Sequence, residues 1–196
     1  MNTVSSGVVM ADYIAKWHRE HINFSKLLDL LETQINLFHE DEHPNYELML
    51  DIMYYLTHYA DQVHHPEEEV AFKRVVQKDS RMGPVVTDLT KQHQLIAENG
   101  KTLTEQLDAI VIDSMVTRQS IESSARTYIF HLRSHMNLEE TALFPTASNI
   151  LRVEDWAAVD AAIKSRQDPL FGEIVDKRYE ALHQQIAREA ECGCKE

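Results

Sequence analysis

The chain has 196 residues, of which 43% are hydrophobic, and its 32 acidic and 19 basic residues give a formal net charge of −13. This composition predicts a globular protein with a sizeable core and excludes a disordered chain, while the negative charge disfavours nucleic acid and anionic membranes as partners. The first residues lack the pattern of a signal peptide and no stretch approaches the roughly 20 apolar residues of a membrane span, so we expect a cytoplasmic protein.

Helical periodicity predicts four long helices, over residues 9–40, 46–79, 84–113 and 118–148. The chain has only five glycines and five prolines, and Pro44 and the Gly83-Pro84 pair fall where the periodicity lapses. We therefore expect an all-α fold in which residues 1–150 form an antiparallel up-and-down four-helix bundle. A C-terminal helical extension over residues 151–196 is expected to contain two shorter helices, one near EDWAAVDAAIK and one after DPLFG.

Histidines interrupt the apolar stripes of these helices in a repeating pattern. His21 lies in the first stripe and His93 in the third, while the second and fourth helices carry the motifs HHPEEEVAF, from His64, and HMNLEETALF, from His135. Both motifs read His-x-x-x-Glu-Glu and end in Phe. His21 and His64 are separated by 43 positions, and His93 and His135 by 42. Two helical hairpins related by an approximate twofold would bring all four imidazoles to one layer of the bundle.

Residues four positions apart lie on the same face of a helix, so each motif directs an imidazole and a carboxylate at one point of the core. Six such groups, buried without partners, would each cost free energy on the order of kcal/mol, whereas bound metal satisfies all of them. The candidate metal ligands are His21, His64, Glu68, His93, His135 and Glu139.

The motif HHPEEEVAF also contains His65, Pro66 and Glu69, which need an interpretation of their own. His65 and Glu69 share a face that differs from that of His64, and we expect them to support the ligands from outside or to contact solvent. Pro66 lacks a backbone donor, so we expect it to kink the helix here and to free a carbonyl near Gln62.

Four imidazoles and two carboxylates, without a thiolate, favour first-row transition metals over magnesium or calcium. One zinc ion needs only four ligands, so six ligands indicate two ions. Bridging carboxylates and a solvent-derived bridge would leave one open position on each ion, which suits O2, NO or peroxide. We therefore expect two non-haem iron ions with carboxylate and oxo or hydroxo bridges, and a small diatomic molecule or peroxide as their ligand.

These motifs resemble those of the hemerythrin-like family, also called the HHE cation-binding domain. The matching segments are REHINFSKLLDLLE, HHPEEEVAF, KQHQLIA and HMNLEETALFP, within about residues 9–149, and EDWAAVDAAI and DPLFG are similar to the tails of bacterial members. The resemblance implies a non-haem di-iron centre in a four-helix bundle, with the same six residues as ligands. It also implies a protein that binds, senses or detoxifies O2, NO or peroxide, and a redox partner protein is a further expectation.

The third helix departs from the pattern of oxygen-carrying hemerythrins, which place two histidines one turn apart on it. Leu89 and Ala97 stand four positions before and after His93. Without that fifth histidine, the chain is more similar to family members associated with NO, oxidative stress and iron-centre repair. Iron storage or delivery, and enzymatic reduction of peroxide or NO, are the alternatives, beside a metal-free helical bundle.

Other candidate groups are interpreted as structural or exposed. Glu40 with His43 and Glu180 with His183 have the Glu-x-x-His spacing of ferritin-type sites, but chance explains both better. His131 lies one turn before His135, on a helix whose core side is already marked by apolar residues. Solvated side chains are expected for His18, His39, His43, His58 and His183. Bundle packing is expected for Tyr13, Tyr54, Tyr55, Tyr59 and Tyr128, any of which, if near the metals, would donate a hydrogen bond to a bound species.

Both cysteines, Cys192 and Cys194, belong to the C-terminal CGCKE segment. We therefore expect no disulfide that staples the fold together, and a tail with exposed thiols.

Overall fold

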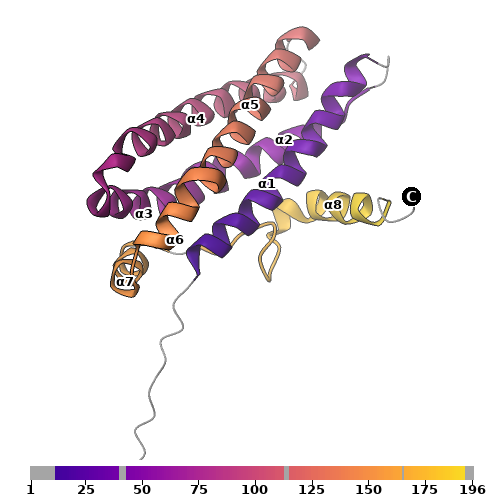
Figure 1. Cartoon of the computed structure of the whole chain (residues 1–196). Coiled ribbons are helices and arrows are strands. Elements are labelled where there is room, and N and C mark those ends of the chain that lie inside the picture. The colour runs from indigo at the N-terminus through magenta and orange to yellow at the C-terminus, as the bar shows by residue number, and fades with distance from the viewer. Residues whose placement is uncertain (1–11, 40–42, 113–114, 165, 193–196) are drawn as a thin grey trace, which may run out of the picture.

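The computed structural model describes residues 12–39, 43–112, 115–164 and 166–192, and all regular elements in these ranges are helical (Figure 1). The first long segment is α1 (Tyr13–Asn36), which continues into the short 3-10 helix η1 (Leu37–His39). The second runs without a break through α2 (Tyr46–Tyr55), the π-helix η2 (Leu56–His64) and α3 (His65–Lys78).

The third long segment is α4 (Gly83–Val111), which follows the 3-10 helix η3 (Ser80–Met82). The fourth comprises α5 (Arg118–Leu138), the π-helix η4 (Glu139–Leu143) and α6 (Phe144–Ile150). The prediction of an all-helical chain is confirmed for the described residues. The four predicted ranges agree with these segments to within a few residues, while residues 9–11, 40 and 113 lie outside the described part.

Side-chain caps explain where three of the long segments begin. Asp12 accepts a hydrogen bond from the Ala15 backbone N–H at the start of α1, and Thr117 accepts one from Ser120 at the start of α5. Asn45 caps α2 in the same way. Each cap satisfies one of the N–H groups that a helix leaves free at its first turn.

The buried apolar residues form two clusters, and the histidine layer lies between them. On α1, Tyr13 and Trp17 belong to one cluster and the residues from Phe24 onward to the other, so His21 marks the boundary. On α4, Leu89 and Ile96 lie on either side of the boundary in the same way. The core is thus apolar at both ends and polar at one intermediate level.

The chain after residue 150 contains α7 (Val153–Ala162), the 3-10 helix η5 (Lys177–Tyr179) and α8 (Glu180–Cys192), which agrees with the two predicted short helices. These elements are not detached from the bundle. Val159 belongs to one apolar cluster, and Leu170, Tyr179 and Leu182 belong to the other. Among the described helices, none combines the length and the apolar character that crossing a membrane requires.

Candidate metal centre

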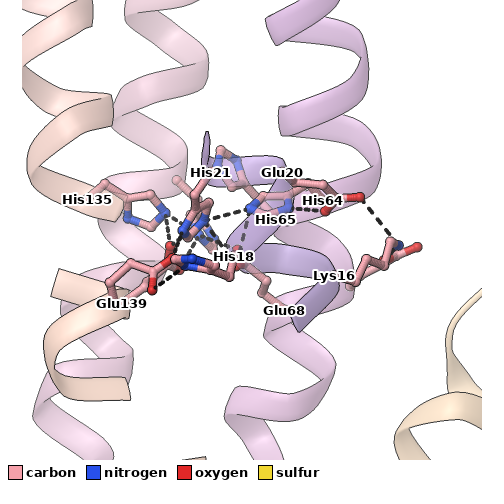
Figure 2. Close-up of polar contacts among 12 residues, drawn as sticks. Lys16, His18, Glu20, His21, His64, His65, Glu68, His135 and Glu139 are labelled. Atoms are coloured by element: carbon pink, nitrogen blue, oxygen red, sulfur yellow. Dashed lines mark hydrogen bonds and ion pairs between the residues drawn. The ribbon is translucent and has the colours of Figure 1, made fainter. Parts of the chain in front are cut away.

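The six residues singled out from the sequence meet at the polar level of the core. They come from α1 (His21), the end of η2 (His64), α3 (Glu68), α4 (His93), α5 (His135) and the start of η4 (Glu139). All six are buried, and both glutamates are fully buried. Figure 2 shows imidazoles and carboxylates from different helices directed toward one another.

The distances between their polar atoms are those of ligands that share an ion. The Nε2 atoms of His21 and His64 lie 3.1 Å apart, as do those of His93 and His135. Glu68 Oε1 lies 3.2 Å from His64 Nε2 and 3.6 Å from His21 Nε2. With metal–ligand bonds of about 2.1 Å, two ligands of one ion stand roughly 3.0 to 3.4 Å apart at octahedral and tetrahedral angles. The side chains are therefore arranged for coordination.

Both carboxylates face the two pairs of imidazoles at once. Glu68 directs Oε1 toward His64 and His21 and has its Oε2 4.0 Å from His93 Nε2. Glu139 Oε2 lies 3.2 Å from His135 Nε2 and 3.4 Å from His21 Nε2, and its Oε1 lies 3.7 Å from His93 Nε2. This geometry suits carboxylates that bridge two ions.

Hydrogen bonds on the outer side of the imidazoles fix which nitrogen faces the centre. Nδ1 of His64 lies 2.7 Å from a Glu20 oxygen, and Nδ1 of His21 lies 2.8 Å from a Glu140 oxygen. An ionised carboxylate only accepts hydrogen bonds, so each Nδ1 carries the hydrogen and each Nε2 presents a lone pair to the core.

The second hairpin repeats these supports. His93 Nδ1 lies 3.2 Å from Glu69 Oε1, and His135 Nδ1 lies 3.2 Å from Gln92 Oε1. Glu69 thus supports a ligand from outside, as the sequence predicted. Each acceptor is the sequence neighbour of a ligand on an adjacent helical segment, so the approximate twofold inferred from the histidine spacing extends to the groups behind the imidazoles.

The buried carboxylates of the donor set need a positively charged partner, which a metal ion would supply. None of the four carboxylate oxygens of Glu68 and Glu139 has a hydrogen-bond partner among the described residues. The nearest nitrogens lie 3.2 Å from them, and two lone pairs at that distance need a proton or a metal cation between them. Imidazole and carboxylate ligands without thiolates suit borderline first-row metals.

Protons compensate the carboxylates when no metal does. Burial alone would lower the pKa of His64, but the nearby charge of Glu68 and the hydrogen bond to Glu20 raise it to about 9. The pKa of His93 is likewise raised to about 9, because the nearby carboxylates of Glu139 and Glu68 and the hydrogen bond to Glu69 outweigh burial. Burial would raise the pKa of Glu68, but the positive charges of His64 and His21 hold it well below its usual range. The buried carboxylates thus stabilise positive charge in the site, whether protons or metal ions carry it.

His65 corrects the sequence-based expectation. It neither contacts solvent nor lies behind the ligands: it is buried, and with His93 and His135 it forms a group whose ligand atoms lie within 4.8 Å of one another. Its ring stacks on that of His93 with centroids 4.2 Å apart. Burial lowers its pKa well below the ordinary value, and its Nε2 has no hydrogen-bond partner in the described chain. A fifth imidazole, neutral because of its burial, therefore lies beside His93 and His135.

Two π-helical segments flank the site. η2 ends at His64 and η4 begins at Glu139, and each is followed within two residues by a proline, Pro66 or Pro145. A proline has no N–H to donate to the preceding turn, so the wider π-turn absorbs the lost hydrogen bond. The expected disturbance at Pro66 is thus a π-turn, which changes the angular spacing of side chains on the way to His65.

The remaining groups from the sequence lie away from the centre or at its edge. His131 is half-buried against Phe130 and belongs to none of the metal-ligating groups found among the described residues. Glu180 and His183 are exposed on α8, while Glu40 and Cys194 lie outside the described residues. His18 is 55% exposed, as predicted for a solvated residue, although its Nδ1 lies 3.0 Å from Glu140.

Comparison with known proteins agrees with this site. The family model described as the hemerythrin HHE cation binding domain matches residues 12–147, a span that contains all five inward imidazoles and both carboxylates. A search of the curated proteins found no match.

Proposed function

Because the chain belongs to the hemerythrin HHE cation-binding family, we propose that it is a non-haem di-iron protein that binds, senses or detoxifies O2, NO or peroxide. One observation supports this most: four imidazoles direct Nε2 toward two buried carboxylates whose oxygens have no hydrogen-bond partner among the described residues, and a fifth imidazole, that of His65, lies beside His93 and His135. In this proposal residues 1–150 are the metal-binding domain, an antiparallel up-and-down four-helix bundle, and residues 151–196 are its helical extension.

The proposed ligands divide into two sets. His21 and His64 would hold the first ion, and His93 and His135 would hold the second together with His65. Glu68 and Glu139 would serve both ions, because each faces imidazoles of both sets. Bound iron would supply redox chemistry and positions for a small ligand, while the chain orients the imidazoles and keeps water out.

The third imidazole makes the two positions unequal. With both carboxylates and a solvent-derived oxo or hydroxo bridge, the first ion would have five ligands and the second, with His65, would have six. We therefore expect a small ligand at the first ion. An open hollow of about 430 Å³ lies on this side, lined in part by His18, Glu140 and Phe144, and the Phe144 ring stacks on His21 at 5.3 Å. This hollow supports access from the His21 side.

His65 also changes how the departure on the third helix is interpreted. Leu89 still replaces the second histidine expected there, but a fifth imidazole reaches the centre from α3. The number of imidazoles therefore does not separate oxygen binding from reactions with NO or peroxide. Iron storage or delivery, or repair of iron centres, is the alternative, and delivery of electrons by a redox partner protein belongs to the main proposal.

Metal analysis with an absorption spectrum tests the proposal. We expect about two iron ions per chain and an oxo-bridge band that changes on adding azide, NO or peroxide. The variant His135→Ala should lose iron, whereas His183→Ala, an exposed histidine of α8, should retain it. A folded parent that takes up no iron would contradict the proposal. Multiple turnovers of peroxide or NO would identify an enzyme, and loading far above two ions, or transfer to an apo acceptor, would favour storage or delivery.

A further inference from the structure

A column of tyrosines leads from His64 to the C-terminal extension. The Tyr59 hydroxyl donates to Glu20 Oε1 at 2.8 Å, and Glu20 Oε2 lies 2.7 Å from His64 Nδ1. The Tyr59 ring stacks on Tyr55 with centroids 5.4 Å apart and planes inclined by 19°. Tyr55 in turn meets the Tyr179 ring edge-on at 5.6 Å. Three buried phenols thus form a continuous contact path away from the proposed metal centre.

The column reaches the surface beside the extension. Tyr179 contacts the half-buried ring of Tyr54 at 6.4 Å, and the guanidinium of the exposed Arg178 lies 3.3 Å above that ring. Tyr54 also stacks on the exposed His58 at 3.8 Å. The far end of the column is therefore open to molecules in solution.

The two phenols nearest the centre each have a carboxylate that can take their proton. Tyr59 donates to Glu20, and Tyr55 donates to Asp168 Oδ2 at 3.0 Å. Burial raises the pKa of both phenols far above the ordinary value, so neither is ionised at physiological pH. Burial also raises the pKa of Asp168, which makes this carboxylate a better proton acceptor. Oxidation of Tyr55 can therefore be coupled to a proton transfer over hydrogen-bond distance.

A second aromatic run from the centre begins with a phenylalanine and a tryptophan, and its phenol, Tyr13, comes only after them. Phe144 stacks on His21, and Trp17 contacts Phe144 at 5.9 Å and Trp156 at 6.4 Å. A phenylalanine is hard to oxidise, and Trp17 Nε1 has no hydrogen-bond partner among the described residues to accept its proton. The tyrosine column therefore differs from this run in having phenols with carboxylate acceptors next to the centre.

We propose that Tyr59, Tyr55 and Tyr179 form an electron-transfer route between the di-iron centre and the surface at Tyr54, an inference that rests on the proposed function. Peroxide is the oxidant, and its reduction to two water molecules takes up two electrons and two protons. Tyr55 gives one electron toward the centre and its phenolic proton to Asp168, which leaves a neutral tyrosyl radical; the other electron is drawn from the iron. The redox partner protein at the surface end returns one electron to Tyr55, which takes its proton back from Asp168, and a second electron along the same route to the iron, while solvent supplies the two protons that peroxide takes up.

Electron paramagnetic resonance on the iron-loaded full-length chain, frozen shortly after hydrogen peroxide is added, tests this route. We expect a tyrosyl radical in the parent and its loss in Tyr55→Phe. Tyr13→Phe is the matched control, because Tyr13 donates to Asp160 at 2.7 Å and so makes the same kind of link between the bundle and the extension outside the column. Its radical signal should equal that of the parent. Mass spectrometry should find oxidised tyrosine within the column in the parent.

Iron content and circular dichroism are measured first for every variant. If Tyr55→Phe does not hold iron, Asp168→Asn keeps the phenol and removes the base, and its radical yield should be lower than that of the parent. A parent that holds two iron ions and consumes peroxide without forming a tyrosyl radical would overturn the route while leaving the proposed function intact. The route would also be overturned if the radical signal were unchanged in Tyr55→Phe or, where that variant holds no iron, in Asp168→Asn. A parent protein that takes up no iron would contradict both proposals.

Discussion

The substitution His65→Met separates a packing role of His65 from a metal-binding role. His65 Nε2 is buried without a hydrogen-bond partner in the part of the chain that the structure describes. The equivalent position of the motif HMNLEETALF is already a methionine, Met136, which is buried in the apolar core. Methionine is flexible, similar in volume and free of strong polar atoms, so it suits this position. The substitution makes the first hairpin resemble the second.

The two expected effects have opposite signs. A buried polar atom without a partner costs about 1–3 kcal/mol, so metal-free His65→Met should be more stable than the parent by up to this amount. In the iron-loaded chain, loss of an imidazole should weaken binding by at least the roughly 10–100-fold that loss of a supporting group costs. That factor corresponds to about 1.4–2.7 kcal/mol. The variant should therefore gain stability without metal and lose affinity for it.

Chemical denaturation of the metal-free protein measures the first effect, and iron titration against a competing chelator measures the second. Met136→Leu is the matched control, since a volume-conserving apolar exchange costs under about 1.5 kcal/mol and removes no proposed ligand. If His65→Met retains the iron affinity of the parent, His65 is not a ligand. If the metal-free variant is less stable than the parent, the account of an unpartnered imidazole is wrong.

Three further predictions concern the bundle, the groups behind the ligands and pH. A Cβ on Gly100 would lie 3.0 Å from Tyr128 Cε2, so Gly100→Ala should lower the free energy of unfolding by roughly 1–2 kcal/mol despite better helix propensity, and higher stability in denaturation would contradict this. Glu20→Gln should weaken iron binding by about 10–100-fold through His64, measured against a chelator, and unchanged affinity would show that the carboxylate is dispensable. Because the pKa of His64 and His93 is raised to about 9 in the metal-free chain, metal binding near pH 7 should release their protons and apparent affinity should rise with pH up to about 9. The stability that the protonated His64 and His93 contribute to the metal-free chain is complete below about pH 6.5 and is lost as the pH rises through about 9. Calorimetry in several buffers measures the proton release, and a metal-binding enthalpy that does not depend on the ionisation enthalpy of the buffer would contradict it.

The common level of the histidine layer could be predicted because helical geometry is regular over long distances. The separations of His21 from His64 and of His93 from His135 depend only on rise per residue and hairpin length. The ranges of the long helices followed from the same periodicity. The apolar clusters on either side of the layer agree with the stripes from which the histidines stood out.

The orientation of His65 could not be predicted because it depends on a local departure from that regularity. A projection at 3.6 residues per turn gives His65 a face different from that of His64, and the wider turns of η2 change this angle over nine residues. The motif HHPEEEVAF also contacts both α1 and α4, so a helix at this position is buried on more than one side. Pro66 was the available signal, but a proline predicts a disturbed turn without saying which kind.

The acceptors behind the imidazoles were missed for a different reason. Glu20 and Glu140 are adjacent in sequence to ligands, but each supports an imidazole on another helical segment. A projection of a single helix shows that such a residue lies outside the core-facing stripe. It does not show which neighbouring helix the side chain contacts. The doubled carboxylates of EEE and EE were a usable signal, because one glutamate can face the centre while the next supports a histidine across the interface.

The approximate twofold symmetry of the two hairpins accounts for the repeated pairs of candidate ligands. The positions at which the hairpins differ would make two bound ions unequal. A symmetric pair of hairpins would supply each ion with two imidazoles and equal supports, and neither ion would be favoured by a small molecule. In this chain His65 stands where the second hairpin has Met136, and the carboxylate of Glu20 stands where the second hairpin has the neutral amide of Gln92. The first change would close the coordination of the second ion, and the other would place negative charge behind a ligand of the first. In the proposed function, both changes would direct reaction with a small ligand to the His21 side, where Phe144 and Glu140 border the surface hollow.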